Sequence, residues 1–573
     1  MLPFSLLFVL AVLDVAWAGL VARIPERRRQ PLRLHEHIRR QISNGTVANT
    51  TSSGIVPITL ADDKQTYYSV LNVGNISFRS AIDSGSADFW LLSSGCSTSA
   101  CKSPPKYPLN YASPTFVSVN NNASTFNLSF ADGSNAVGFV ARETVQLANL
   151  TVPNQAFGLV NSSTVSFVDE ISGVLGLGFP RLSTIYSVAA NATPFLGSLA
   201  SGHLDYPLFG VSLTRNSTSG TLAFGAIDST VVQNASLIEW NEVVPFQPFL
   251  GSPQNTSSYL QWAIPLANIQ IGSTTVKPQP TYPQANGNSS IALLDIGTAG
   301  LFGPYQDVER IFSALSGSRI VNTNGQWAIP CDTNDTLTFT FGAQNFTMLP
   351  SDYLLGPIQE DPNLCYSWPQ ATPPSSDGID WQIGSSFLRT VYTIFSYGIT
   401  SKEPPMIGLY PLTPSTPAPT ALPQASLSAL FSSLSLTVSV GLPNSLVPTP
   451  TFTTPPYAFN TSVPTSLISG DLATSTYTPL LSNIDHAGGA PTGRFNFSAL
   501  PQVAPAPTVQ TLVLTASNGA VFTTTSTLPS QSLALGKPPG WTSSAALKLA
   551  MPQLSACVAV AMTCMLVVAG AIY

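Results

Sequence analysis

A short acidic pattern occurs twice in this chain of 573 residues, and the duplication constrains the fold more than any other feature. The first copy, "AIDSGS", contains Asp83, and the second, "LLDIGT", contains Asp295. Each is followed by a mostly apolar stretch that reaches a Gly, "SGVLGLGF" with Gly176 and "WQIGSSFL" with Gly384. The Asp-to-Gly separations are similar, 93 and 89 residues. An acidic loop followed at a matched distance by a strand that ends in Gly, found twice, predicts two related lobes.

The region that carries both copies, residues 41–412, has the patterning of β-structure. Apolar and polar residues alternate in "STFNLSFADG", "FVARETVQL", "SGTLAFGAI" and "DTLTFTFGAQNFTML". Alternation of period two, interrupted by Gly, Asn and Ser, is typical of strands and hairpins. The best helix candidate is one short segment, Tyr305–Leu315. We therefore predict an all-β fold.

Paired carboxylates can perform acid–base chemistry if the two acidic loops meet. Two carboxylates held close together do not both ionise easily, so the pair shares one proton and supplies both an acid and a base. The base activates a water, the acid protonates a carbonyl, and no covalent intermediate is needed. The Gly after each Asp allows tight approach of the loops. The hydroxyls of Ser86 and Thr298 can each hold the carboxylate three residues earlier.

Other catalytic chemistries have few residues available in residues 41–412. The single His there is His203, in "SGHLDYPLFG", and an ordinary surface or turn position is its expected role. With one His and four Cys that we expect to be oxidised, few of the usual metal ligands remain, so we expect no metal and no cofactor. A Ser-His-Asp or Cys-His site would depend on that one His. The sequence contains neither a P-loop nor a Gly-rich dinucleotide motif that opens a helix.

The first forty residues predict targeting and processing. Residues 1–18 are apolar and end in Ala-Trp-Ala, which favours a secretory signal peptide over a buried N-terminal helix. Residues 19–40 contain seven Arg and no Lys and end in a dibasic pair. A nucleic-acid or heparin patch is one interpretation of this charge, but its position favours a pro-segment removed after Arg40. Residues 41–412 carry 12 basic and 23 acidic residues, a net charge of −11, which would complement such a segment.

The last part of the chain predicts a stalk and an anchor. Residues 413–545 are rich in Ser, Thr, Pro and Ala, contain only four charged residues, and suggest an O-glycosylated stalk that builds no core of its own. Residues 546–573 end in an uncharged apolar run long enough to span a bilayer. Small residues at 543–545, a short spacer and the apolar end favour a GPI-attachment signal, with a tail-anchored helix as the alternative.

The cysteines and glycosylation motifs also favour the secretory pathway. The chain contains sixteen N-x-[ST] sequons without Pro at the middle position. Of six cysteines, Cys557 and Cys564 lie in the apolar C-terminus. The other four can pair locally, as 96–101 and 331–365, although other pairings remain open at this point. An oxidising compartment favours disulfides over metal ligation.

The residues around the two acidic loops resemble the pepsin-like (A1) aspartic proteases, over about residues 60–412. The resemblance is carried by "YYSVLNVG", "DSGSADFWLLSSGCSTSAC", "FNLSFADGSNAVG", "SGVLGLGFPRLS", "LFGVSLTRNSTSGTLAFGAID" and "WQIGSSFLRTVYTIF". It implies a bilobal β-fold with an N-terminal lobe at 41–235, a C-terminal lobe at 236–412 and a cleft between them. It also implies hydrolysis of peptide bonds at acidic pH. The signal, stalk and anchor resemble those of surface-attached fungal members.

The resemblance assigns roles to individual residues. It implies that Asp83 and Asp295 are the catalytic pair. Supporting roles in the acidic loops fall to Ser84, Gly85, Ser86, Gly297 and Thr298. Flap and substrate-binding roles fall to Trp90, Phe130, Asp132, Gly133 and Ser134, with Gly133 and Ser134 at the flap tip. It also implies a small disulfide loop, Cys96 to Cys101, and a second-lobe disulfide between Cys331 and Cys365.

Three positions depart from the pattern of the family. Ile296 stands where the family has Thr or Ser, whose hydroxyl bonds to the backbone of the opposite loop, so only Ser84 can reach across. A buried backbone N–H and carbonyl would then lack a partner, at about 1–3 kcal/mol each. Phe130 replaces the flap Tyr and loses a hydrogen bond expected near Trp90, and Ala131 replaces a flap Gly. These departures predict slower hydrolysis or altered specificity, and they leave a non-catalytic member open.

Two functions follow from these observations. The first is a cell-surface aspartic endopeptidase that acts on peptides or proteins, in which one Asp activates the water and the other supplies the proton. The second is a protease-shaped protein that binds peptides, or acts structurally, without cleaving them. We expect the chain to be a monomer without a nucleic-acid partner, located extracellularly and held at the membrane or cell wall by its C-terminal anchor.

Overall fold

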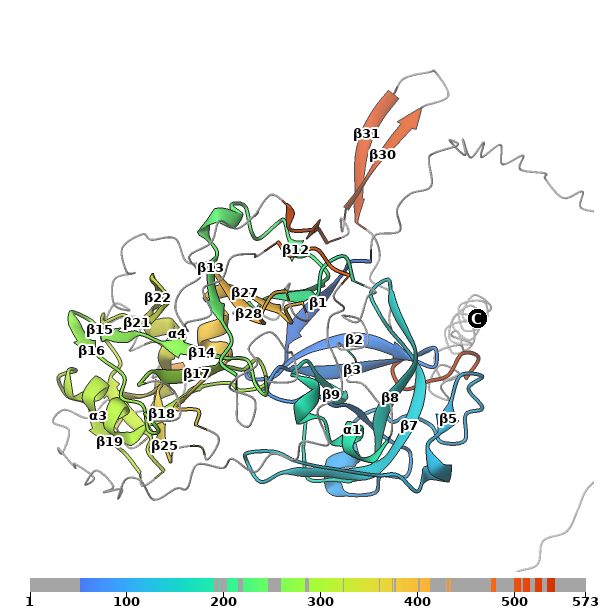
Figure 1. Cartoon of the computed structure of the whole chain (residues 1–573), viewed down its shortest axis with the longest axis horizontal. Coiled ribbons are helices and arrows are strands. Elements are labelled where there is room, and N and C mark those ends of the chain that lie inside the picture. Colours follow the sequence, from blue (N-terminus) through green and yellow to red (C-terminus); the bar gives the residue numbers. More distant parts are fainter. Residues whose placement is uncertain are drawn as a thin grey trace, which may run out of the picture. The chain divides into compact units, whose positions relative to one another are not determined.

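The computed structural model describes most of the region between residues 52 and 412 and a few pieces beyond it (Figure 1). The described residues are 52–189, 195, 204–214, 220–245, 259–283, 288–322, 324–359, 361–373, 375, 378–399, 402–412, 429, 432–433, 476–480, 499–505, 509–515, 521–527 and 533–541. The predicted signal peptide, the pro-segment, His203, Cys557, Cys564 and the C-terminal apolar segment lie outside them.

The fold is built mainly of β-strands, which confirms the predicted class. The largest sheet has 14 strands and contains elements from both halves of the chain. Its path runs through β13 (Glu239–Glu242), β28 (Met406–Pro411), β27 (Val391–Ser396), β10 (Leu208–Ser212), β11 (Gly220–Phe224), β1 (Gly54–Leu60), β2 (Tyr67–Val73), β3 (Ile76–Asp83), β9 (Ile171–Gly176), β4 (Phe89–Leu92), β8 (Leu150–Ser163), β7 (Asn135–Leu147) and β5 (Val117–Ser118), with β6 (Thr125–Ser129) paired to β7.

Smaller sheets form the second lobe, which Figure 1 shows in green and yellow beside the blue and teal first lobe. A five-stranded sheet contains β14 (Ala263–Leu266), β17 (Ser290–Leu294), β26 (Trp381–Ile383), β18 (Leu301–Pro304) and β25 (Gln370–Thr372). Two four-stranded sheets contain β16 (Thr274–Val276), β15 (Asn268–Ile271), β21 (Leu337–Phe341) and β22 (Gln344–Met348), and β19 (Arg319–Ile320), β20 (Trp327–Pro330), β24 (Leu364–Ser367) and β23 (Leu354–Pro357).

Helices are few and short within the described residues. They are α1 (Thr184–Val188), α3 (Tyr305–Ser313), α4 (Pro350–Tyr353), α5 (Ser385–Leu388) and the 3₁₀ turns η1 (Ser99–Cys101), η2 (Asn120–Asn122), η3 (Pro180–Leu182) and η4 (Ala235–Leu237). The helix predicted at 305–315 is confirmed as α3, two residues shorter at its end. Its buried face consists of Asp307, Val308, Ile311 and Phe312.

The alternating segments form the strands that their patterns predict. "STFNLSFADG" contains β6, "FVARETVQL" lies within β7, and "DTLTFTFGAQNFTML" forms the β21–β22 hairpin. "SGTLAFGAI" contains β11 and the first residue of a short strand, β12 (Ile227–Asp228). In β6 and β22 the alternation separates buried from more exposed residues, because successive side chains point to opposite faces of a sheet.

The duplication of the acidic loops is also a duplication of topology. In the first lobe the sheet order is β3-β9-β4, with β3 parallel to β9 and β4 antiparallel to it. In the second lobe the order is β17-β26-β18, with the same two directions. Each acidic loop connects the first and last strand of its trio, so the two loops are equivalent positions of one repeated unit.

The two lobes share a sheet and a core. β10 of the first half pairs with β27 of the second, with Phe209 opposite Phe395 and their rings stacked at 4.6 Å between centroids. Trp262 packs near both rings and donates its indole N–H to the Leu177 carbonyl at 3.0 Å. The predicted lobe boundary at residue 235 therefore does not separate the sheets, because β27 and β28 return to the first lobe.

Three pieces of the predicted stalk contact the body. Residues 476–480 lie against Tyr206, and residues 499–505 add the short strand β29 (Gln502–Val503) parallel to β12. Residues 533–541 reach β3, where the Gly536 N–H donates to the Ser77 carbonyl at 2.9 Å. A separate hairpin joins β30 (Val509–Thr515) and β31 (Val521–Thr527). Within the part of the chain that the structure describes, we find no helix of the length and apolarity that a membrane span requires.

Candidate active site

The first acidic loop follows β3 and holds its carboxylate at both oxygens. Asp83 is the last residue of β3. Its Oδ1 accepts the Gly85 N–H at 2.8 Å, and its Oδ2 accepts the Ser86 hydroxyl at 2.6 Å. Because both donors come from the following three residues, the loop itself fixes the carboxylate plane.

The second acidic loop repeats this arrangement. Asp295 follows β17, and its Oδ1 accepts the Gly297 N–H at 2.9 Å. Its Oδ2 accepts the Thr298 hydroxyl at 2.7 Å. Ser86 and Thr298 thus occupy the positions that the sequence predicted for them, each bonded to its own carboxylate.

The two carboxylates face each other across the pair of loops. A Cβ built on Gly85 would lie 2.8 Å from Oδ2 of Asp295, and one built on Gly297 would clash with the Asp83 carboxylate. Gly is therefore required at both positions by space. Burial, and then the negative charge of Asp295, raise the pKa of Asp83 to about 7. Such a pair holds one shared proton at acidic pH.

Ser84 crosses between the loops, and Ile296 does not. The Ser84 hydroxyl accepts the Ile296 N–H at 2.9 Å and donates to the Leu294 carbonyl at 3.2 Å. Ile296 is 1% exposed and has no hydroxyl to return these bonds. The sequence predicted this one-sided arrangement, and apolar packing of the Ile side chain takes the place of the missing pair.

The predicted flap residues form the turn of the β6–β7 hairpin. The Phe130 N–H donates to the Ser134 carbonyl at 2.8 Å, and Gly133 adopts a left-handed φ of +83° at the turn. Asp132 accepts both the N–H and the hydroxyl of Ser134 at 2.8 and 2.6 Å. The turn is therefore closed by its own side chains and by a Gly that its backbone conformation favours.

Trp90 lies under this hairpin with an unsatisfied donor. Its ring centroid lies 6.5 Å from that of Phe130, and the side chain is fully buried. Its indole Nε1–H has no hydrogen-bond partner among the described residues. The hydrogen bond that a Tyr at position 130 was expected to make with Trp90 is therefore absent.

Gln382 is a contact that the sequence analysis missed. Its Nε2 donates to Oδ2 of Asp295 at 3.0 Å and to the Thr298 hydroxyl oxygen at 2.6 Å. Gln382 lies in the middle of β26, which pairs it with Leu293 of β17. The available signal was its polarity inside the otherwise apolar "WQIG", whose counterpart in the first lobe is "GVLG".

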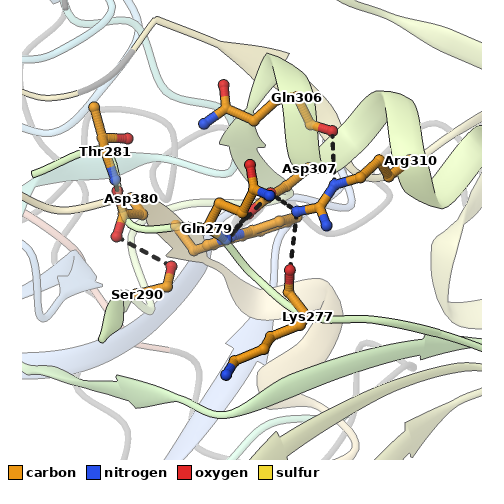
Figure 2. A network of polar contacts seen from close by, with 9 residues as sticks. Lys277, Gln279, Thr281, Ser290, Gln306, Asp307, Arg310 and Asp380 are labelled. Atoms are coloured by element: carbon orange, nitrogen blue, oxygen red, sulfur yellow. Dashed lines mark hydrogen bonds and ion pairs between the residues drawn. The ribbon is translucent and has the colours of Figure 1, made fainter. Parts of the chain in front are cut away.

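Two further buried carboxylates hold the strand that carries Gln382 (Figure 2). Asp307 of α3 accepts the Gln279 N–H, the indole N–H of Trp381 and a guanidinium N–H of Arg310. Asp380 accepts N–H groups of Thr281 and Ile291 at 2.8 and 3.0 Å, and the Ser290 hydroxyl at 3.0 Å. These bonds fix the middle of the loop at 277–283 and the start of β26.

The four remaining predicted residues form two disulfides. Cys96 pairs with Cys101, and Cys331 pairs with Cys365. The first closes the loop after β4, and the second joins β24 to the end of β20. Among the described residues there is no group of three or more His, Cys, Asp or Glu that could hold a metal ion.

The geometry agrees with a known protein family. The family model for eukaryotic aspartyl protease matches residues 66–401, which is more than half of the chain and includes both acidic loops. The chain belongs to the eukaryotic aspartyl protease family. Its bilobal β-fold is therefore the pepsin-like fold that the sequence resembled.

Several characterised proteins are similar to the chain over most of this region. Major aspartyl peptidase 1 of Cryptococcus neoformans is 28% identical over 390 residues, 65% of this chain and 74% of that protein. Rhizopuspepsin-1 of Rhizopus niveus is 30% identical over 374 residues, 63% of this chain and 84% of that protein. Mouse cathepsin E is 28% identical over 439 residues, 72% of this chain and its own full length.

Proposed function

We propose that this member of the family is an active aspartic endopeptidase, with Asp83 and Asp295 as its catalytic pair. The observation that carries the proposal is the mutual approach of two carboxylates, each held at both oxygens by its own loop. The raised pKa of Asp83, caused by burial and by the charge of Asp295, gives such a pair one proton at acidic pH. The substrates are peptides or proteins, and no cofactor takes part.

The reaction needs only the pair and a water. The ionised carboxylate takes a proton from the water, whose oxygen attacks the carbonyl carbon of the peptide bond. The protonated carboxyl gives its proton to the carbonyl oxygen, which produces a neutral tetrahedral diol. The carboxyl that took the proton from the water then gives it to the nitrogen of the leaving group as the C–N bond breaks, while the other carboxylate takes a proton from one hydroxyl of the diol. The pair ends with one proton, as it began.

The departures from the family pattern reduce the rate in this account without abolishing it. Ile296 removes hydrogen bonds between the two loops, and Phe130 leaves the Trp90 N–H unpaired. Both affect groups that hold the carboxylates or the hairpin, and neither replaces a carboxylate. Loose placement of a catalytic pair costs rate because proton transfer requires short, aligned contacts.

The alternative is a protease-shaped protein that binds peptides without cleaving them. The same two departures favour it, since they weaken the support of the pair. The intact donors on all four carboxylate oxygens favour the enzyme.

We also propose that the protein enters the secretory pathway and is retained at the cell surface. The two disulfides support an oxidising compartment. In this proposal residues 1–18 are the signal peptide, residues 19–40 a pro-segment, residues 413–545 a glycosylated stalk, and residues 546–573 a GPI signal or membrane anchor. The mature protein is a monomer.

Hydrolysis of peptides by the full-length protein tests the enzyme proposal. The protein is produced through a eukaryotic secretory pathway, and cleavage of a peptide library is followed between about pH 3 and about pH 7. We expect cleavage at acidic pH that pepstatin inhibits and that Asp83→Asn abolishes. Pepstatin binding without cleavage at any pH would favour the peptide-binding alternative.

A further inference from the structure

The two carboxylates of the pair are not held equally. Oδ2 of Asp83 accepts one side-chain donor among the described residues, the Ser86 hydroxyl. Oδ2 of Asp295 accepts two, the Thr298 hydroxyl and the Gln382 amide. Each Oδ1 accepts one backbone N–H, so the extra bond to Asp295 is not balanced by another to Asp83.

The direction of the Gln382 amide follows from its partners. The Thr298 hydroxyl has a single hydrogen, which it donates to Asp295, so it can only accept from Gln382. The Asp295 carboxylate is likewise an acceptor when ionised. Both neighbours therefore require the NH₂ end of the amide, and Gln382 acts as a double donor at 3.0 and 2.6 Å.

The repeated topology shows that this donor exists in one lobe only. Asp83 pairs with Gly176 across β3 and β9, and the residue two before that Gly is Val174. In the second lobe Gln382 stands two residues before Gly384, at the equivalent position of β26. Val174 has no hydrogen-bonding side chain, so Gln382 breaks the approximate symmetry of the pair.

The strand that carries Gln382 is held in place on both sides of it. Trp381 donates its indole N–H to Asp307. Asp380 accepts from Ile291 and from Ser290 at the start of β17, and Figure 2 shows the bond to Ser290. Gln382 itself pairs with β17 on one side and with Phe302 of β18 on the other. A donor on so constrained a strand is pre-positioned, because its backbone cannot move away from the carboxylate.

We propose that Gln382 is a positioning residue that holds the negative charge of the pair on Asp295 and the shared proton on Asp83. A donor that bonds an ionised carboxylate stabilises the charged form. On the proposed function, which this inference deepens, Asp295 is then the base that activates the water and Asp83 is the acid.

Other charged groups do not account for the asymmetry. From β3 and its loop, the donors are Gly85 and Ser86, and from the loop after β17 they are Gly297 and Thr298. Within the described part of the chain, neither carboxylate forms a salt bridge with a Lys, Arg or His side chain. After burial, the charge of Asp295 is the largest cause of the raised pKa of Asp83.

The pH profile of kcat/KM tests this proposal, since its limbs report the ionisations of the free enzyme. Gln382→Met keeps the length of the side chain without a donor, and Gln382→Val copies the first lobe. Removing the donor makes the singly ionised pair less stable relative to the doubly protonated pair, so the pKa of that ionisation rises. We expect the acid limb to move up by about half to one pH unit, allowing for solvent at this partly exposed site. The alkaline limb should stay, because singly and doubly ionised pairs both lose the bond.

Gln370→Met is the matched control. Gln370 lies opposite the same residue of β18, Phe302, but on β25, and its amide donates to the Asn324 carbonyl at 2.8 Å. This variant should keep both limbs of the parent. If Gln382→Met and Gln382→Val lower activity equally at every pH, or leave the profile unchanged, the proposal is overturned.

Pepstatin binding separates this proposal from the proposed function. Its affinity for the full-length protein is measured over the same pH range by fluorescence or calorimetry, and it should show the same upward shift in both Gln382 variants. If the parent binds pepstatin but cleaves nothing, the endopeptidase proposal fails while the shift still decides the role of Gln382. If the parent neither binds nor cleaves, both proposals fail.

Discussion

At the scale of single residues, the most informative atom is the indole nitrogen of Trp90. It is buried beneath the β6–β7 hairpin and has no hydrogen-bond partner among the described residues. A buried donor without a partner costs about 1–3 kcal/mol. Phe130 supplies ring contact in place of a hydroxyl, so the turn of the hairpin forms no side-chain hydrogen bond with Trp90. This leaves the hairpin less firmly placed than a hydrogen bond would.

Phe130→Tyr should restore the missing bond. We expect the substitution to raise the free energy of unfolding by about 0.5–1.5 kcal/mol and to increase kcat/KM, because the hairpin gains a fixed position. Thermal unfolding and peptide hydrolysis at acidic pH measure the two effects. In a Trp90→Phe background the indole donor is absent, so the same substitution should give no gain. An equal gain in that background would show that the hydroxyl acts elsewhere.

The sequence predicted most residues of the candidate site because their geometry is local. Ser86 and Thr298 bond carboxylates three residues away, so a short motif contains the whole interaction. Gln382 meets Asp295 only through the pairing of β17 with β26, 87 residues away along the chain. Without that register, one polar residue in an apolar strand has no assignable partner.

At the scale of elements, the contact between the two acidic loops is one-sided. The Ser84 hydroxyl bonds both the Ile296 N–H and the Leu294 carbonyl, and nothing equivalent returns from Ile296. The first loop is therefore tied to the second through one side chain. The repeated topology implies that a hydroxyl at position 296 would face the Ser84 N–H and the Ile82 carbonyl in the same way.

Ile296→Thr should complete this contact. Two new hydrogen bonds at about 1 kcal/mol each offset the loss of apolar burial at this position, so stability should change little. We expect kcat/KM to rise by about two- to tenfold, because both loops are then fixed from both sides. Ile296→Val is the matched control, since it removes a methylene and adds no hydroxyl. If both variants have the same kinetics, the missing hydroxyl does not limit the site.

Strands with a strict alternation were predictable, and the joining of the lobes was not. β6 and β22 show their pattern because the polar residues of each lie on a face that is at least partly exposed. β27 is buried along its whole length, so its sequence carries no alternation and gives no sign that it pairs with β10. Pairing between strands almost two hundred residues apart depends on the packed core, which local patterns do not encode.

At the scale of the whole molecule, described pieces of the tail, which is the chain after residue 412, pack against the two-lobed body. Leu500 is 3% exposed within a cluster that includes Ile227 and Trp240, and β29 extends the edge at β12. Tyr477 donates its hydroxyl to the Leu204 carbonyl at 2.7 Å. Composition predicted a stalk because the segment cannot form a hydrophobic core of its own. Composition does not show whether such a segment packs against the core of another part of the chain.

Leu500→Ala tests the docking of the tail. Truncation of a buried Leu costs about 2–5 kcal/mol, so the melting temperature of the full-length protein should fall by several degrees. Leu533→Ala is the matched control, because Leu533 lies in the same tail and is 54% exposed. Equal melting temperatures for the two variants would mean that the tail does not stabilise the body.

The stability of the protein should decrease as pH rises from acidic to neutral. Burial raises the pKa of Asp83 and of Glu242 to about 7, and it raises the pKa of Asp88, Asp307 and Asp380 as well. The folded state then binds more protons than the unfolded state between the ordinary carboxyl pKa and about pH 7, so the free energy of unfolding falls through this window.

Melting temperatures measured between about pH 4 and about pH 7 check this expectation. Asp83→Asn removes one of the raised groups and should flatten the decline in part. Glu242→Gln, at a buried carboxyl outside the site, should flatten it to a similar extent while activity is retained. A melting temperature that increases toward neutral pH would contradict the assignment.

The most direct test of the central claim is kcat/KM of Asp83→Asn, Asp295→Asn and the double variant at the acidic optimum of the parent. Groups that act as one unit are not additive, because losing either member destroys the shared function. We predict that each single variant loses on the order of a thousandfold or more and that the double variant loses no further activity. Retention of activity within about tenfold by either single variant, or losses that multiply in the double variant, would contradict a shared catalytic pair.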